Sequence, residues 1–155
     1  MIAENAREFA ALMPDGGVLL ALDLGTKTIG TALSDAGWMF ATAGKTLPRG
    51  KFTRDRAVLE ELCRTRRVAG LVIGLPRNMD GSEGPRAQAT RAYARNLDVL
   101  GLPILLWDER LSTASAERDL IAQDVSRAKR AERIDSHAAA VILQGALDAL
   151  AGGMF

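Results

Sequence analysis

The chain has 155 residues and a mass of 16.6 kDa, the size of one ordinary domain, which argues against a two-domain enzyme. Its 20 Lys and Arg residues nearly balance 19 Asp and Glu residues, so the net charge of +1 does not by itself indicate a nucleic-acid or membrane partner. The single cysteine, Cys63, cannot form an internal disulfide. Because no signal peptide and no run of about 20 apolar residues is recognisable, we expect a cytoplasmic protein without a membrane span.

The first part of the chain has the pattern of one short helix followed by three strands. Apolar residues at helical spacing predict the helix over residues 3–13. Alternating or continuous apolar runs, separated by glycine-containing turns, predict antiparallel strands over residues 18–24, 28–34 and 38–46. The first of these strands is apolar except for one carboxylate near its end, Asp23.

Helices and strands alternate in the remainder of the chain. Helical periodicity predicts helices over residues 53–67, 85–100 and 134–151, and a further helix that Ser112 or Thr113 caps. Apolar runs predict strands over residues 68–75 and 103–107. A meander followed by alternating helices and strands indicates an α/β domain, in which a mixed five-stranded sheet is flanked by helices.

Four carboxylates lie where an apolar element begins or ends: Asp23, Asp108, Glu109 and Asp135. Any one of them alone could be a helix cap or a salt-bridge partner. Together they predict a cation site, since clustered carboxylates repel one another and oxygen ligands favour Mg²⁺ or Mn²⁺. Two such ions can activate water and stabilise the leaving oxygen of a phosphodiester.

Asp108 and Glu109 are adjacent, and strand alternation directs them to opposite faces of the sheet. Only one of the two is therefore expected to bind the metal. The residues alone leave open which one does. His137, two residues after Asp135, fits either a structural role or a role as a base or phosphate contact.

Candidate phosphate contacts lie in three places. The polar loop 77–84 follows a strand and offers Arg77 and Asn78 as donors. A basic stretch leads directly into Asp135 and contains Arg127, Lys129, Arg130 and Arg133. It is expected to bind a nucleic-acid backbone, with a solvated face as the alternative. Lys27 and Arg110 lie beside the acidic residues and are further candidates.

Four ordered motifs resemble the YqgF family, also called RuvX, of pre-16S rRNA nucleases, which are similar to Holliday junction resolvases. The motifs are Ala21–Gly30, Gly74–Glu83, Asp108–Thr113 and Asp135–Ala139. The resemblance implies an RNase H-like fold over residues 17–151, preceded by an accessory helix in residues 1–16. It also implies that Asp23, Glu109 and Asp135 bind the metal. The implied role is maturation of the 5′ end of 16S rRNA, with structured RNA or a pre-ribosomal particle as the substrate. Branched DNA is another possible substrate.

Two other classes of function remain open at this point. The segment around Asp23 also resembles the phosphate loop of actin-like ATPases, but those proteins close two such domains around a nucleotide and this chain has the length of one. The third class is a catalytically weak RNA-binding factor in ribosome assembly. Cleavage of structured RNA or branched DNA with Mn²⁺, compared with an Asp23→Asn variant, separates these classes.

Overall fold

Residues 1–111 and 127–151 are described in a computed structural model, with side chains described for residues 1–111 and 136–151. Its strands form one mixed sheet in the order β1-β7-β6-β2-β3-β4, and β5 pairs with β3. The strands are β1 (Ile2–Ala3), β2 (Val18–Leu24), β3 (Thr28–Ser34), β4 (Ala41–Ala43), β5 (Leu47–Pro48), β6 (Val68–Leu75) and β7 (Ile104–Asp108). β2, β6 and β7 are parallel, whereas β3 is antiparallel to β2. The carboxyl ends of β2, β6 and β7 therefore share one edge of the sheet.

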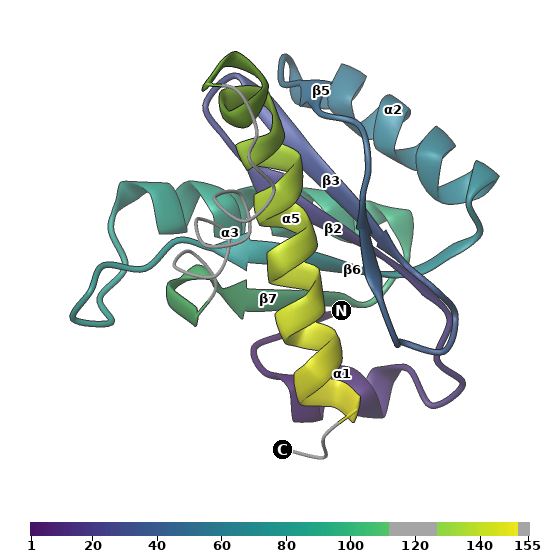
Figure 1. The fold of residues 1–155 in the computed structure, drawn as a ribbon. Coiled ribbons are helices and arrows are strands. Elements are labelled where there is room, and N and C mark those ends of the chain that lie inside the picture. The colour runs from purple at the N-terminus through teal and green to yellow at the C-terminus, as the bar shows by residue number, and fades with distance from the viewer. Residues whose placement is uncertain (112–126, 152–155) are drawn as a thin grey trace.

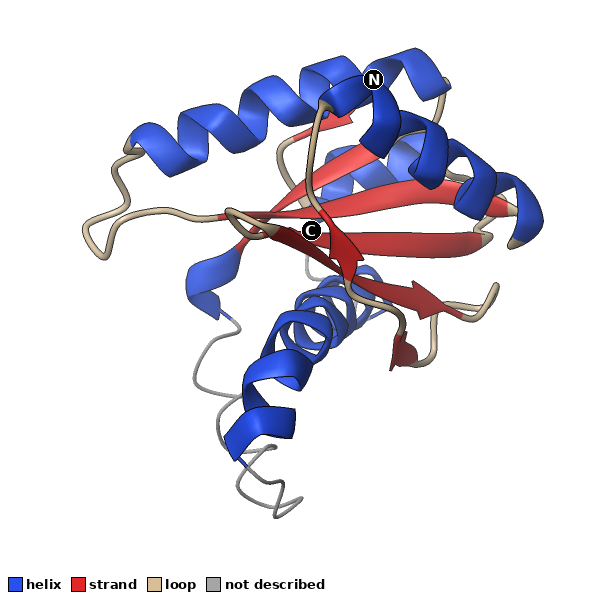
Figure 2. Ribbon diagram, turned by 90° about the horizontal axis from the view of Figure 1, so that it is seen from above, coloured by secondary structure: helices blue, strands red, loops and turns tan. Residues whose placement is uncertain are grey.

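Helices cover both faces of this sheet. The α-helices are α1 (Ala6–Leu12), α2 (Phe52–Thr65), α3 (Pro85–Leu97) and α5 (Arg127–Ala151), and short 3₁₀ helices span Asp98–Leu100 and Glu109–Leu111. α5 crosses one face and α2 and α3 cover the other (Figures 1 and 2). Two apolar cores result, one between the sheet and α5 with α1, the other between the sheet and α2 with α3.

Alternation along β2 divides its side chains between the two cores. Leu20, Leu22 and Leu24 belong to the core under α2 and α3, and Leu19 and Ala21 belong to the core under α5. This arrangement explains why the strand is apolar on consecutive positions: both of its faces are buried by helices. Asp23 has the parity of Leu19 and Ala21 and therefore lies on the face that α5 covers.

In the described part of the chain the sheet has seven strands, two more than predicted. In place of the predicted strand over residues 38–46, the structure has two short strands, β4 and β5. Between them the chain passes close to β3, as the contact at Gly44 shows: a Cβ atom there would lie 2.6 Å from Thr31 Oγ1. β1 pairs with β7 in parallel at the opposite edge of the sheet. Its two residues are too few to show any strand pattern in the sequence.

Residues 1–16 contribute to the same core as the rest of the chain. Phe9 of α1 is fully buried among residues of the sheet and α5. The helix begins at a cap in which the Asn5 side chain accepts a hydrogen bond of 2.9 Å from the Glu8 backbone N–H. α1 begins three residues later than the predicted helix, because Ile2 and Ala3 are extended in β1.

The last helix begins earlier than predicted. α5 starts at Arg127 rather than at Ile134, so the basic stretch from Arg127 to Arg133 has a helical backbone. The helix that was predicted from Ser112 or Thr113 lies outside the described residues. Among the described helices, none combines the length and the apolar character that a membrane span requires.

Candidate active site

Asp23 lies near the carboxyl end of β2, between two glycines on the neighbouring strands. It pairs with Gly30 of β3. On its other side β2 pairs with β6 up to Leu22 opposite Ile73, and this register places Gly74 beside Asp23. Neither neighbour carries a side chain that could fill the space around the carboxylate on the α5 face. Asp23 is accordingly half-buried although its strand is in the middle of the sheet.

Glu109 lies on the same face, directly over Gly74. A Cβ atom added at Gly74 would lie 2.6 Å from Glu109 Oε1 and 2.7 Å from Ile142 Cδ1 of α5. Real Cβ atoms do not approach other atoms this closely, so the absence of a side chain at position 74 is what allows Glu109 to pack there. Asp23 and Glu109 therefore occupy adjacent positions above β2 and β6, next to α5.

Asp108 lies on the opposite face of the sheet. Leu106, two residues earlier, belongs to the core under α2 and α3, whereas Trp107 packs against the core under α5. The Arg110 guanidinium donates to the Asp108 carboxylate, with 2.6 Å from Nη2 to Oδ2, and it holds the pKa of this carboxyl below its usual value. The structure thus separates the adjacent acids, and it brings Glu109 rather than Asp108 to the side of Asp23.

The third predicted ligand, Asp135, lies in the backbone of α5, and its side chain is outside the described part of the structure. The next residue fixes the position of this turn. Ser136 Oγ and Thr46 Oγ1 share a hydrogen bond, and Thr46 precedes Leu47, which pairs with Ile29 of β3. Since Gly30 follows Ile29 and pairs with Asp23, this turn of α5 lies over the same row of the sheet as Asp23.

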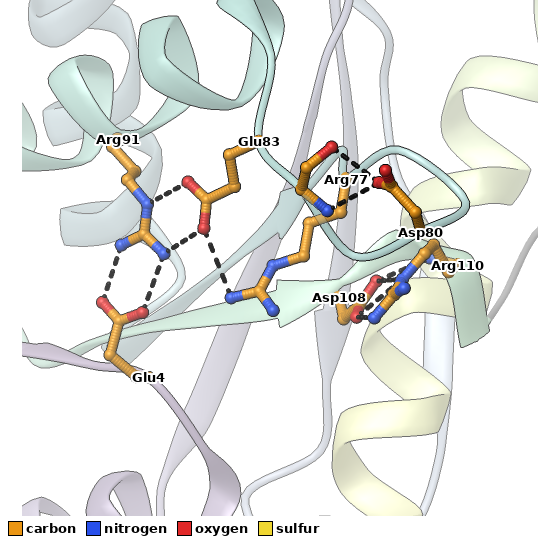
Figure 3. A network of polar contacts seen from close by, with 8 residues as sticks. Glu4, Arg77, Asp80, Glu83, Arg91, Asp108 and Arg110 are labelled. Carbon is orange, nitrogen blue, oxygen red and sulfur yellow. Dashed lines mark hydrogen bonds and ion pairs between the residues drawn. The ribbon is translucent and has the colours of Figure 1, made fainter.

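A network of ion pairs lies at the same edge of the sheet, on the side of α3 (Figure 3). Arg91 of α3 contacts two carboxylates: its Nε lies 2.6 Å from Glu83 Oε1, and its Nη1 lies 2.9 Å from Glu4 Oε2. Arg77 Nη2 lies 3.4 Å from Glu83 Oε2. The network connects the N-terminal segment, the loop 76–84 and α3, and Arg91 holds the pKa of Glu83 below its usual value.

The predicted phosphate contacts lie in different environments. Lys27 is exposed in the turn after β2. Asn78 is exposed and its side-chain amide donates to Ser82 Oγ at 2.9 Å, which stabilises the loop. Arg77 and Arg110 are both engaged by carboxylates, as described above. Arg127, Lys129 and Arg130 belong to the first turn of α5, and their side chains lie outside the described residues. His137 is half-buried in the same helix.

The donor chemistry of this edge fits a divalent cation. Asp23 and Glu109 supply carboxylate oxygens on one face, and hard oxygen ligands suit Mg²⁺ or Mn²⁺. The side chains described in the structure contain no group of three or more His, Cys, Asp or Glu residues that could hold a metal. Two of the three predicted ligands are therefore close together, and the third belongs to the undescribed side chains of α5.

Gly74 opens the second motif, but its role in making room for a carboxylate was not predicted from the sequence. A glycine inside an otherwise apolar buried strand is a signal for close approach of another group. Gly70 in the same strand has the same property, since a Cβ atom there would lie 2.5 Å from Met13 Sδ. The signal therefore marks close packing in general, and it cannot by itself distinguish the carboxylate above Gly74 from the thioether above Gly70.

Comparisons with known proteins agree with this arrangement. A family model described as "RuvX: Holliday junction resolvase" matches residues 17–149. A protein of Novosphingobium aromaticivorans named "Putative pre-16S rRNA nuclease" is 63% identical over 155 residues, which cover 100% of both chains. A protein of the same name from Sphingopyxis alaskensis is 63% identical over 150 residues, which cover 97% of this chain and 99% of its own.

Solved structures confirm the predicted RNase H-like α/β fold. Thermus thermophilus RuvC in complex with a Holliday junction substrate superposes with a TM-score of 0.56, covering 89% of this chain and 96% of RuvC. A second structure of the same protein gives a TM-score of 0.51 and covers 87% and 96%. Both are 13% identical to this chain, so this likeness concerns the fold alone. The family match and the full-length relatives go further, and the chain belongs to the RuvX family of Holliday junction resolvases.

Proposed function

We propose that this protein is a metal-dependent endonuclease that hydrolyses phosphodiester bonds at the 5′ end of pre-16S rRNA. The observation that carries the proposal is the placement of Asp23 and Glu109 side by side on the α5 face, with the glycine at position 74 making room for the second carboxylate. Asp135 is the proposed third ligand, because it belongs to the turn of α5 that lies over the same row of the sheet.

The three carboxylates are proposed to hold Mg²⁺ or Mn²⁺. When bound, such ions activate a water molecule and stabilise the leaving oxygen of a phosphodiester. Asp23 is anchored on a central strand, so its position is fixed by the sheet. Glu109 packs over Gly74 next to Ile142, which supports a fixed orientation of its carboxylate. Asp108 pairs with Arg110 and is proposed to position the start of the 3₁₀ helix.

The names of the relatives support a pre-16S rRNA substrate, and such a substrate would place the protein in the cytoplasm, on structured RNA or a pre-ribosomal particle. The proposed backbone contacts are Lys27, Arg77, Asn78, Arg110 and the first turn of α5 with Arg127, Lys129 and Arg130. The Holliday junction bound to RuvC supports branched nucleic acid as a second substrate class to assay.

Cleavage of an RNA that carries the 5′ leader of 16S rRNA tests the proposal. The wild-type protein is expected to cleave it with Mg²⁺ or Mn²⁺, and not with a chelator. Asp23→Asn should reduce the rate at least about 100-fold, since losing one metal ligand costs several kcal/mol of transition-state stabilisation. Unchanged cleavage by Asp23→Asn would contradict the proposed site. RNA binding with no cleavage by the wild type would indicate an assembly factor instead.

A further inference from the structure

We propose that a cationic cluster next to the end of β2 binds a backbone phosphate of the nucleic acid beside the cleavage site. The cluster comprises Lys27, Arg49, Lys51, Arg54 and Arg86. The inference deepens the proposed function and rests on it for the identity of the ligand as nucleic acid. None of the last four residues is among the predicted site residues.

Two arginines from different elements reach the same turn. Arg49, which follows β5, donates from Nη1 to the Gly25 carbonyl oxygen at 2.7 Å. Arg86, in the first turn of α3, donates from Nη2 to the Leu24 carbonyl oxygen at 3.3 Å. Leu24 directly follows Asp23, so both guanidinium groups lie at the same end of β2 as the proposed metal ligand. Each guanidinium has five N–H donors, and one bond to a carbonyl leaves others for a phosphate.

Three more cations belong to the segments that meet this pair. The Arg54 guanidinium packs over Gly50, where an added Cβ atom would lie 3.1 Å from its Nη2. Lys51 is exposed between these two residues, at the start of α2. The Lys27 carbonyl oxygen accepts a hydrogen bond from the Arg49 backbone N–H at 2.9 Å, which joins the turn after β2 to the same group.

No exposed acid neutralises these cations within residues 45–56. That segment has five basic residues and one acidic residue, Asp55. Asp55 is buried and accepts hydrogen bonds from the Gly50 backbone N–H at 3.1 Å and from the Tyr93 hydroxyl at 3.3 Å. Its charge is therefore used inside the fold, and the surface of the segment is positive although the whole chain carries only +1.

Arg49 is held in place rather than being an independent solvated side chain. Arg49 stacks on the Tyr93 ring, with 5.0 Å from Cζ to the ring centroid, and Tyr93 in turn packs edge-on against Phe52. Side chains that are already fixed lose less conformational entropy when they bind a ligand. A guanidinium also matches the geometry of a phosphate better than an ammonium does. These properties distinguish a phosphate subsite from a merely soluble surface.

The position of the cluster defines what it would bind. Its arginines come from the α2 and α3 side of the sheet, whereas Asp23 and Glu109 lie on the α5 side. A strand that crosses this edge would place one phosphate at the carboxylates and a flanking phosphate at the arginines. Such contacts fix the register of the strand and do not depend on base sequence.

The test compares two double variants that remove the same charge from the same two helices. Arg54→Ala with Arg86→Ala removes cluster residues near the starts of α2 and α3. Arg64→Ala with Arg95→Ala removes exposed arginines from the last turns of these helices. The measurement is the affinity for a short fluorescein-labelled DNA duplex, without divalent metal, across a salt series from about 50 to 200 mM.

The slope of log affinity against log salt should fall by about 0.9 in the cluster variant, the value for one lost phosphate contact, and should not change in the control variant. Equal slopes in the cluster variant and the wild type would overturn the proposal. So would an equal fall in both variants, which would indicate a net-charge effect, or an absence of binding by the wild type. Because binding is measured without metal, its outcome is independent of whether Asp23→Asn abolishes cleavage.

Discussion

Asp108 and Glu109 are neighbours in the chain, and they lie in contrasting environments on the two faces of one sheet edge. Asp108 faces the α3 side and is bound by the Arg110 guanidinium within a region of ion pairs. Glu109 faces the α5 side and packs over a glycine next to Asp23. A single step along the chain therefore separates a carboxylate that pairs with Arg110 from one that packs beside Asp23 and that we propose as a metal ligand.

The fold gives two carboxylates of the same chemistry different environments. Strand alternation determines the face, and the residues on each face determine what the carboxylate meets. On the α3 side the loop 76–84 and α3 supply arginines, whereas on the α5 side Gly30 and Gly74 flank Asp23 without side chains. The predictions that follow test whether the two faces differ in function as they do in structure.

The largest expected effect is the difference between Glu109→Gln and Asp108→Asn. Removing the Glu109 charge should reduce cleavage at least about 100-fold, because a metal ligand is lost. Asp108→Asn should retain cleavage within a few-fold while lowering stability, because only an ion pair is lost. Single-turnover rates and thermal unfolding of both variants check this. Equal losses of activity would remove the distinction between the two acids.

The next effect concerns the space over β6. Gly74→Ala places a Cβ atom where Glu109 and Ile142 now pack, and both side chains must move. The cleavage rate should fall by about tenfold or more, since displacement of a catalytic group by about 1 Å is costly. Gly101→Ala is the control for adding a methyl group, because nothing lies within 4 Å of the added atom, although its positive φ adds some strain. A fully active Gly74→Ala would show that the position of Glu109 is unimportant.

Disruption of the ion-pair network around Arg91 should lower the free energy of unfolding rather than the cleavage rate. Arg91→Ala leaves Glu83 and Glu4 without their shared partner and should cost about 1–2 kcal/mol of unfolding free energy, since charged hydrogen bonds in a partly buried network are lost. Arg64→Ala removes an exposed pair with Glu61 and should cost at most about 0.5 kcal/mol. Denaturant unfolding measures both, and similar costs would mean that the network adds nothing beyond isolated surface pairs.

The smallest effect is the pH dependence of stability. Arg110 lowers the pKa of Asp108 in the folded protein. The ion pair therefore contributes fully to the unfolding free energy at a pH above the unfolded-state pKa of about 3.9, and this contribution is lost as the pH falls through the lower pKa of the folded state. The unfolding free energy should therefore decrease with falling pH below about 5, and Asp108→Asn should decrease less steeply. Parallel curves for the wild type and the variant would contradict this assignment.

The sequence allowed the main elements and the place of Asp23 near the end of its strand to be predicted, because a strand buried on both sides leaves a continuous apolar run that a carboxylate interrupts visibly. Alternation also placed Asp108 and Glu109 on opposite faces. The choice between them depends on Gly74 and Ile142, which are 35 and 33 residues away in the chain from Glu109. Such long-range contacts have no local pattern.

Other features could not be predicted for similar reasons. β1 has two residues and owes its existence to pairing with β7, and the helical start of α5 carries no apolar periodicity. The cationic cluster is spread over three segments that only the folded sheet brings together. Its one local signal is the excess of basic residues between positions 45 and 56, which the balanced charge of the whole chain conceals.

Metal binding by the intact protein distinguishes the two faces most directly. Titration with Mn²⁺, followed by calorimetry, should show binding by the wild type, at least about a tenfold weaker affinity for Glu109→Gln, and an affinity within about twofold of the wild type for Asp108→Asn. If Asp108→Asn weakens Mn²⁺ binding as much as Glu109→Gln, or if Glu109→Gln leaves it unchanged, then the carboxylate beside Asp23 on the α5 face is not the metal ligand.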